Sequence, residues 1–345
     1  MNVAVAVITA FAAALAVTGA SGFVLVPWLR QFQFGLPVSY GDKKLYGSGN
    51  VPTAGGVMLV LGTVSSVLIT VLTDKLMGGD IAASGSLVPQ EMYTKLWSGV
   101  ITATAFGFIG FIDDYLYVIT DGKRTLTIKQ KSLFQVLTAV AYLISLYMGM
   151  QGAPFMFVPF VGNVETGFFY WISGIVFIYC TVNSADCTDG IDGLSSGISV
   201  TAAVSLGVIA ALKGFFGFSA VAAALAGACV GFIFWNKNPA KINSGKTGSM
   251  FLGGMTVVLA YALNSPLILL LACISYFIEG ISVAVQIIYF KATGGKLLLK
   301  TAPLHRHMEI CGKSHRKISL TLTVINILGG ASAVAVMYYG GYILR

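Results

Sequence analysis

Long uninterrupted apolar runs constrain the fold of this chain more than any other feature. Hydrophobic residues make up 56% of the 345 residues and charged residues only 10%, whereas soluble domains carry about 25% charged residues. A segment inside lipid must satisfy its own backbone hydrogen bonds, and runs of this length do so as helices rather than as barrel strands. We therefore expect an all-α integral membrane protein in which residues 1–345 form a single polytopic domain.

The apolar runs divide into ten predicted membrane spans. The first run lacks the basic start of a signal peptide and is too long for one, so we interpret it as a retained span. The ten spans cover residues 4–29, 55–72, 97–118, 133–150, 168–184, 194–212, 217–235, 249–263, 265–290 and 318–343.

The basic residues lie almost entirely on one side of these spans. All but four of the 21 Lys and Arg fall in the loops after the odd-numbered spans, the exceptions being Lys75, Lys95, Lys213 and Arg345. The positive-inside rule then places those loops in the cytoplasm and both termini outside the cytoplasm. Because the net charge of +8 gathers on one membrane face, we attribute it to topology and to contact with the lipid bilayer. We expect no nucleic-acid partner.

The residues that suggest chemistry lie in the same predicted cytoplasmic loops. After the fifth span, carboxylates recur at every third position, at Asp186, Asp189 and Asp192. In a helix this spacing brings them to nearly one face, where a divalent cation or positive groups from elsewhere would relieve their repulsion. Gly190 leaves room for a ligand near the backbone, and the helix N-terminus expected at Leu194 favours phosphate. The alternative is a polar loop capped by Asp and turned by Gly, which leaves the regular spacing unexplained.

A pair of adjacent carboxylates, Asp113 and Asp114, ends the third span. Adjacent residues point in different directions on a helix, so one could face a metal or a nucleophile while its neighbour holds a lysine. A solvated helix end is the alternative, although the negative end of the helix dipole disfavours carboxylates. Lys131, at the start of the fourth span, either binds phosphate or only marks the inner face.

Two later segments are also polar. The segment 245–249 reads Gly-Lys-Thr-Gly-Ser, which has the composition of a phosphate loop but lacks the spacing of a Walker A motif. In the segment 302–309, His305 and His307 occupy alternate positions, and they would face one way if the backbone is extended. Both could contact phosphate, a metal or a proton in transit. The pattern lacks the ligands of a zinc site.

Glu279 is the one ionisable residue deep within a predicted span. A charge at the centre of a membrane helix costs about 2.5–3.5 kcal/mol on insertion scales. We therefore predict a break or bend in the ninth span, with Glu279 facing protein or a water-filled cleft. Its role is either structural or functional.

Taken in order, these motifs resemble those of the polyprenyl-phosphate N-acetylhexosamine-1-phosphate transferase family. The resemblance covers roughly residues 52–309 and is closest to the branch that uses phospho-N-acetylmuramoyl-pentapeptide. It is carried by Pro52-Thr53-Ala54-Gly55-Gly56, Gly110 to Tyr115, Asn183 to Leu194, Asn236 to Ala240, Gly248-Ser249, Glu279 to Val283 and Ala302 to Glu309.

The resemblance implies a transferase of peptidoglycan biosynthesis in the bacterial plasma membrane, with ten spans and a cytoplasmic active site. Its reaction would move phospho-N-acetylmuramoyl-pentapeptide from UDP to undecaprenyl phosphate, releasing UMP and forming lipid I, with Mg²⁺ as cofactor. Phosphoryl transfer of this kind depends mainly on positioning and charge neutralisation. An apolar helix face would also allow a homodimer.

The resemblance further implies roles for individual residues. Asp113 and Asp114 would lie at the phosphate of the nucleophile, with Asp113 as its base. The implied catalytic set is Asp113, Asp114, Lys131, Asp189, His305 and His307. The expected substrate-binding set is Asn183, Gly190, Asp192 and Asn236, together with Lys246 and Arg306, which differ from the family pattern. The expected Mg²⁺ ligands are Asp186 and Asp189.

The chain also departs from the family pattern. Lys246 stands where the family has its main magnesium-binding Asp, Asn243 replaces the aromatic that stacks on uracil, Asp186 replaces an Asn, and Arg306 replaces the middle His. Our hypothesis is that Asp186 has taken over metal ligation while Lys246 contacts phosphate or Asp186.

These departures leave other functions open. One alternative is a related transferase that uses another UDP-sugar, such as UDP-N-acetylglucosamine. Another is a paralogue that binds lipid phosphate or nucleotide without turnover. A transporter of lipid-linked sugar should place polar residues along the middle of several spans, and this chain does not.

Overall fold

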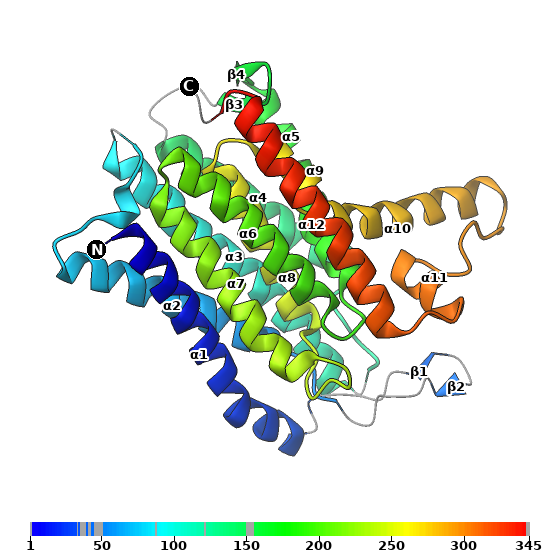
Figure 1. The fold of residues 1–345 in the computed structure, drawn as a ribbon. Coiled ribbons are helices and arrows are strands. Elements are labelled where there is room, and N and C mark those ends of the chain that lie inside the picture. Colours follow the sequence, from blue (N-terminus) through cyan, green and yellow to red (C-terminus); the bar gives the residue numbers. More distant parts are fainter. Residues whose placement is uncertain are drawn as a thin grey trace.

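The computed structural model describes residues 2–32, 34, 39–40, 43–44, 51–86, 88–120, 122–149 and 155–342, and most of them lie in long helices packed side by side (Figure 1). Short 3₁₀ segments cover Ile81–Ala83 and Pro266–Ile268. The α-helices are α1 (Val3–Gln31), α2 (Gly56–Leu76), α3 (Pro89–Ile119), α4 (Ile128–Gly149), α5 (Phe169–Thr188), α6 (Leu194–Lys213), α7 (Phe216–Asn236), α8 (Gly245–Ala262), α9 (Leu269–Ala272), α10 (Ile274–Ala292), α11 (Leu304–Ile310) and α12 (His315–Tyr339).

In the part of the chain that the structure describes, eight helices are long and apolar enough to cross a membrane: α1, α2, α3, α4, α6, α7, α10 and α12. The protein is therefore a predominantly helical, multi-pass membrane protein. The two other predicted spans, 168–184 and 249–263, correspond to α5 and α8. Each of these helices carries polar site residues at one end, and their crossing of the membrane stays a prediction.

Helix α8 is the centre of the bundle, and every residue from Thr247 to Ala262 is buried. Its glycines allow neighbouring helices to approach closely, as is common between membrane helices. A Cβ at Gly254 would lie 3.0 Å from the Cα of Ala103 in α3, and one at Gly253 would lie 2.8 Å from the Cβ of Ala185 in α5. This packing brings the ends of α3 and α5 to the start of α8.

Small residues also allow α1 and α7 to pack closely. A stripe of small residues on α1 is fully buried, at Ala6, Ala10, Ala14 and Thr18. On the facing side, a Cβ at Gly227 of α7 would lie only 2.2 Å from the carbonyl oxygen of Phe11. Side-chain size at the contact, rather than hydrophobicity, sets which faces meet, since lipid is as apolar as the helices themselves.

The predicted break in the ninth span is confirmed. The run 265–290 divides into a 3₁₀ turn, the short α9 and the longer α10, with the interruption at Cys273. In Figure 1, α10 departs from the common direction of the bundle and projects away from it. Glu279 lies on α10 with no exposed surface, so it faces protein, as expected.

Some boundaries and local elements differ from the predictions. Helix α3 begins at Pro89 rather than at 97, and α4 begins at Ile128 rather than at 133. Two short antiparallel hairpins were not predicted: β1 (Ser39–Tyr40) with β2 (Lys43–Lys44), and β3 (Phe155–Val158) with β4 (Gly162–Glu165). Both lie in loops outside the predicted spans.

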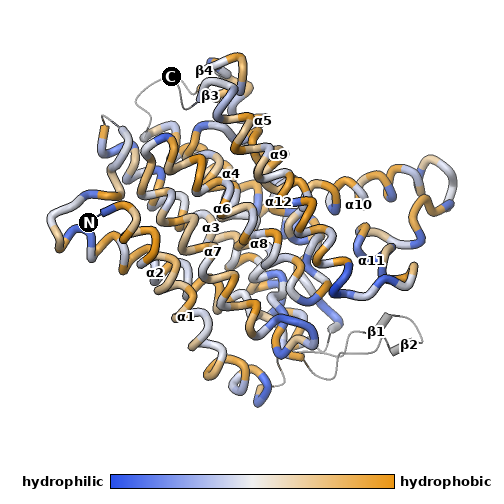
Figure 2. The backbone as a smooth tube through the Cα atoms, viewed as in Figure 1, coloured by the Kyte–Doolittle hydropathy of each residue, from blue (hydrophilic) through white to orange (hydrophobic). Residues whose placement is uncertain are grey.

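Polar residues gather at one end of the bundle. Figure 2 shows hydrophilic backbone colours concentrated around α11 and the loops beside it, whereas the helices between the two ends are mostly hydrophobic. The chemistry-bearing loops predicted from the sequence therefore share one end of the molecule.

Candidate active site

The acidic site forms where α3 and α8 touch backbone to backbone. A Cβ at Gly110 would lie 2.1 Å from the carbonyl oxygen of Lys246 and 2.7 Å from the amide nitrogen of Thr247. Only glycine allows this approach. It places the next turn of α3, which carries Asp113 and Asp114, beside the first turn of α8.

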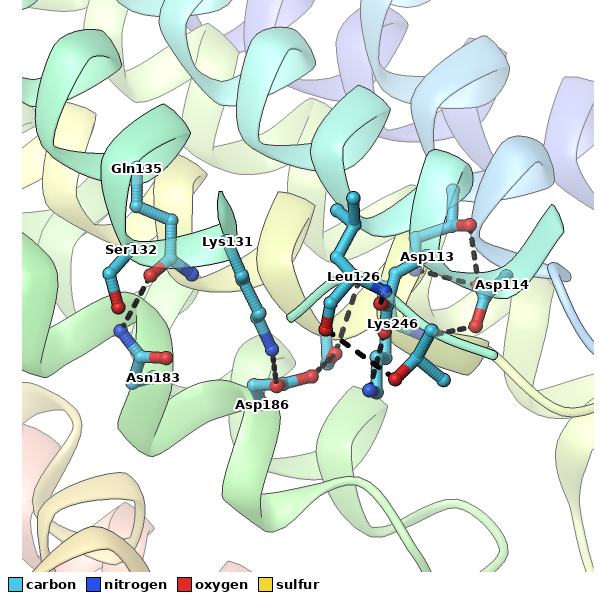
Figure 3. Close-up of polar contacts among 12 residues, drawn as sticks. Asp113, Asp114, Leu126, Lys131, Ser132, Gln135, Asn183, Asp186 and Lys246 are labelled. Carbon is cyan, nitrogen blue, oxygen red and sulfur yellow. Dashed lines mark hydrogen bonds and ion pairs between the residues drawn. The ribbon is translucent and has the colours of Figure 1, made fainter. Parts of the chain in front are cut away.

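Asp113 and Asp114 have different partners, as adjacent residues on a helix should. Asp113 is almost fully buried. It accepts a hydrogen bond from the backbone N–H of Leu126 (2.6 Å) and forms an ion pair with the ammonium of Lys246. The prediction that one member of the pair holds a lysine is confirmed, and Figure 3 shows that lysine close to Asp113.

Asp114 caps the N-terminus of α8. Its carboxylate accepts hydrogen bonds from the backbone N–H groups of Lys246 (3.1 Å) and Thr247 (2.9 Å), and from the Thr247 hydroxyl (2.7 Å). The positive end of the helix dipole stabilises an anion at this position. In this structure the start of α8 therefore binds the carboxylate of Asp114. Binding of phosphate by the segment 245–249 stays a prediction.

Asp186 lies in the last turn of α5 and is held from two sides. Its Oδ2 pairs with the ammonium of Lys131 in the first turn of α4, and its Oδ1 accepts a hydrogen bond from the hydroxyl of Ser249 (2.8 Å). Figure 3 shows Lys131 reaching Asp186 from the neighbouring helix. Of the two partners suggested for Lys246, phosphate or Asp186, the second is not its ion-pair partner, because Lys246 pairs with Asp113. Its contact with phosphate stays a prediction.

Asn183, one helical turn before Asp186, holds α5 to α4. Its side-chain amide donates hydrogen bonds to Oε1 of Gln135 (3.0 Å) and to the carbonyl of Tyr179 (2.8 Å). In this structure the amide N–H groups of Asn183 thus serve helix packing.

Asp189 and Asp192 do not share the helical face predicted for them, because α5 ends at Thr188. Asp189 turns toward α8 and accepts a hydrogen bond from the hydroxyl of Ser244 (2.6 Å). Burial raises the pKa of Asp189 to about 7, against the lowering effect of the Ser244 hydrogen bond. The negative charge of Asp186 raises this pKa further.

Asp192 points instead into the loop after α7. Its Oδ2 accepts hydrogen bonds from the side chain of Asn238 (3.0 Å) and from the backbone N–H of Ala240 (3.1 Å). Asn236 joins the same two loops, because its Oδ1 accepts from the N–H of Gly193 (2.8 Å) and its Nδ2 donates to the carbonyl of Ile242 (2.8 Å). These side chains fix the position of the loop that carries Asp189.

His305 and Glu279 form a buried pair. Both side chains have at most 1% of their surface exposed, and His305 Nδ1 lies 3.1 Å from Glu279 Oε2. The carboxylate also accepts the backbone N–H of His305 (3.1 Å). The other ring nitrogen, Nε2, faces Gly190, where a Cβ would lie 2.9 Å from it. Glu279 therefore orients His305 toward the loop between α5 and α6.

The expectation that His305 and His307 face one way is wrong. The segment forms the helix α11, in which residues two apart point to different sides. His307 Nδ1 accepts the backbone N–H of Lys300 (3.1 Å), and its Nε2 lies 3.7 Å from the sulfur of Cys311. His307 thus contacts the loop that precedes α11 rather than the acidic site.

Arg306 comes to Gly190 beside His305, with a guanidinium nitrogen 3.1 Å from the position of a Cβ on that glycine. A second guanidinium nitrogen donates to Oε2 of Glu309 (2.8 Å), whose Oε1 lies 2.7 Å from His315 Nε2. Sequence reasoning did not assign Glu309 or His315 to the site, although their position in the basic loop was a signal.

Sequence reasoning also missed the hydroxyl groups that hold the carboxylates in place. Ser244, Thr247 and Ser249 each donate to a different aspartate of the site. Their spacing around the start of α8 was the available signal.

The residues expected to bind Mg²⁺ do not form a ready site for it. Mg²⁺ prefers carboxylate and phosphate oxygens and near-ideal octahedral geometry. Among the residues that the structure describes, no group of three His, Cys, Asp or Glu side chains is placed to hold a metal ion. Both oxygens of Asp186 and one of Asp189 already accept hydrogen bonds. The charge of Asp186 also acts on the ammonium of Lys246, as do those of Asp113 and Asp114. The side chains of this chain therefore do not fit a resident Mg²⁺ held by Asp186 and Asp189.

Comparison with known proteins places this site in a family. The model of glycosyl transferase family 4 matches residues 96–264, which include every aspartate of the site. The phospho-N-acetylmuramoyl-pentapeptide-transferases of Listeria innocua and Listeria monocytogenes are 32% and 33% identical to the chain, over 96% of it and 98% of their own length. The chain belongs to the phospho-N-acetylmuramoyl-pentapeptide-transferase family. Its counterpart in Clostridioides difficile is 34% identical over 91% of the chain and 93% of its own length.

As a member of the phospho-N-acetylmuramoyl-pentapeptide-transferase family, the chain has a site built from five separate helices. The ends of α3 and α5 supply carboxylates, the first turns of α4 and α8 supply lysines, and α11 supplies His305 and Arg306. Alternating positive and negative groups of this kind suit phosphate chemistry, in which charge must be both neutralised and oriented.

Proposed function

We propose that the protein transfers phospho-N-acetylmuramoyl-pentapeptide from its UDP carrier to undecaprenyl phosphate, in the synthesis of peptidoglycan. One observation carries this proposal: relatives that bear the name of this activity match the chain at 32–33% identity over 96% of its length. The site supports it independently, because cations and carboxylates from separate helices converge at one polar end of a membrane protein.

The reaction is a phosphoryl transfer between two phosphates. An oxygen of the lipid phosphate attacks the β-phosphorus of the nucleotide sugar, and a new P–O bond forms. The bond from the β-phosphorus to the bridging oxygen breaks, and that oxygen leaves with UMP. Negative charge grows on the leaving phosphate, so the protein's contribution is positioning and charge neutralisation.

In this proposal the positively charged side chains of the site bind the phosphate groups of the substrates. Lys131, Lys246 and Arg306 each have one carboxylate partner in the structure, and ammonium and guanidinium groups carry further N–H donors. Lys246 retains 42% of its side-chain surface exposed, so a diphosphate can reach it. We assign Asp113 to the lipid phosphate as its base. In this proposal, Asp113 gives up its ion pair with Lys246 when the lipid phosphate binds.

Other predicted substrate residues are assigned a positioning role. The side chains of Asn236 and Asp192 form hydrogen bonds that connect the loop after α5 with the loop after α7. Glu279 holds His305, and His305 with Gly190 forms the wall that faces the nucleotide in this proposal. Their substitution should therefore act through the geometry of the site.

The topology proposed with this function has ten spans, with α5 and α8 crossing the membrane and the acidic site on the cytoplasmic face. The distribution of Lys and Arg supports this orientation. It gives the water-soluble nucleotide donor access from the cytoplasm and the lipid acceptor access from the bilayer of the bacterial plasma membrane.

The test is release of UMP by the purified protein in detergent. Undecaprenyl phosphate and UDP-N-acetylmuramoyl-pentapeptide are supplied with Mg²⁺, and UDP-N-acetylglucosamine is tested as donor in parallel. We expect UMP release only with the pentapeptide donor, with loss of at least about a hundredfold in Asp113→Asn, as removal of a general base produces.

The matched control is Asp80→Asn, the same chemical change at an exposed carboxylate. Asp80 contacts Tyr93 near the start of α3, whereas Asp113 lies near the other end of that helix. Asp80→Asn should leave UMP release unchanged. Release with neither donor from folded protein would contradict the transferase, and release with UDP-N-acetylglucosamine alone would replace the proposed donor.

A further inference from the structure

Lys246 lies between the carboxylates of the acidic site. Figure 3 shows it with Asp186 on one side and the Asp113–Asp114 pair on the other. Its ammonium is paired with Asp113, and the charges of Asp186 and Asp114 also act on it. Its own backbone N–H donates to Asp114. One residue thus meets both members of the carboxylate pair.

An ammonium at this position competes with a divalent ion. The ammonium and a divalent ion carry charge of the same sign and repel each other, and the double charge of the divalent ion strengthens this repulsion. The ligands would also be shared, because Mg²⁺ and ammonium both seek carboxylate oxygens. The oxygens of Asp186 are already engaged, by Lys131 and by Ser249.

We propose that the ammonium of Lys246 is the resident cation of this site. The substrate-free protein then binds no divalent ion among these carboxylates, and the ammonium itself contacts the diphosphate of the nucleotide donor. The second part rests on the proposed function. The ammonium has three N–H donors and its recorded partner is Asp113, so donors remain for phosphate oxygens.

The first experiment measures Mn²⁺ binding by electron paramagnetic resonance in the absence of any substrate. We expect no stoichiometric binding by the natural chain and one bound ion in Lys246→Asp, with affinity at least about tenfold higher. Lys237→Asp, an exposed residue in the preceding loop, controls for net charge and should behave as the natural chain does. Lys246→Asn, which removes the positive charge and adds an oxygen, replaces Lys246→Asp if that variant does not fold.

Stoichiometric Mn²⁺ binding by the natural chain, as tight as in Lys246→Asp, would overturn the proposal. This experiment contains no donor and no acceptor, so it does not depend on whether the protein is a transferase.

The second experiment measures UDP binding by calorimetry in the presence of EDTA. We expect the natural chain to bind UDP and Lys246→Met to bind at least about tenfold more weakly, as loss of a charge-assisted hydrogen bond implies. Equal binding by both proteins would overturn the role of Lys246 toward the diphosphate. Absence of UDP binding by the natural chain, with EDTA and with Mg²⁺ alike, would instead refute the proposed function.

Discussion

The contact between Gly110 and the start of α8 gives the sharpest prediction for this protein. Gly110→Ala places a Cβ 2.1 Å from the carbonyl oxygen of Lys246, whereas ordinary contacts begin near 3.4 Å. The atoms in the way are backbone, which cannot rotate aside. The helices α3 and α8 must therefore separate by about 1.3 Å, because a close-packed interior offers no room to absorb the methyl group.

The separation acts directly on the site. Asp113 lies one turn beyond Gly110, and its partner Lys246 lies at the contact itself. Overpacking of this kind costs about 1–3 kcal/mol of stability. A misplacement of about 1 Å in a reacting geometry costs roughly a hundredfold in rate. We therefore expect Gly110→Ala to fold with a lowered unfolding temperature and to release UMP about a hundredfold more slowly.

The assay compares thermal unfolding and UMP release in detergent for Gly110→Ala and Gly19→Ala. Gly19 lies within the helix α1, and a Cβ there would meet no atom within 4 Å. Alanine is a better helix former than glycine, so Gly19→Ala should keep both its stability and its activity. If the two variants release UMP equally fast, the α3–α8 contact does not position the site.

Three further predictions concern the loop between α5 and α6 and the helix α11. Glu279→Gln should lower UMP release and the unfolding temperature together, because the amide presents one acceptor oxygen in place of two to the buried His305; unchanged behaviour in both assays would show that the pair is dispensable. Gly190→Ala should weaken donor binding more than it destabilises the fold, since its methyl group would lie 2.9 Å from the imidazole of His305, and a calorimetric titration with UDP separates the two effects. Burial acts to raise the pKa of Glu309, but its hydrogen bond to His315 and the neighbouring guanidinium outweigh burial and hold the pKa below its usual 4.5. The stabilisation by Glu309 is then present above pH 4.5 and is lost as the pH falls through the lowered pKa of Glu309. The difference in unfolding free energy between the natural chain and Glu309→Gln should therefore shrink with acidification. A difference that grows on acidification would contradict this assignment.

Much of the architecture followed from the order of residues alone. Apolar runs of this length must be helical in lipid, because a helix satisfies its backbone hydrogen bonds within one segment. The predicted spans accordingly correspond to helices, and the loops rich in Lys, Asp and His share one polar end of the bundle. Glu279 also predicted the break in its span, because an unpaired charge in a membrane helix is costly. The break lies at Cys273, before the helix that carries Glu279.

Only the tertiary structure decided which charged groups meet. Lys246 pairs with Asp113 rather than with Asp186, and the two are brought together because Gly110 lets α3 contact the start of α8. The spacing of the carboxylates after the fifth span suggested one helical face, but α5 ends before Asp189 and the chain turns. Ion pairs between distant segments depend on the angle and depth at which helices pack, and neither is contained in local composition. The sequence therefore determines which groups reach the polar end of this protein, and helix packing determines which of them become partners.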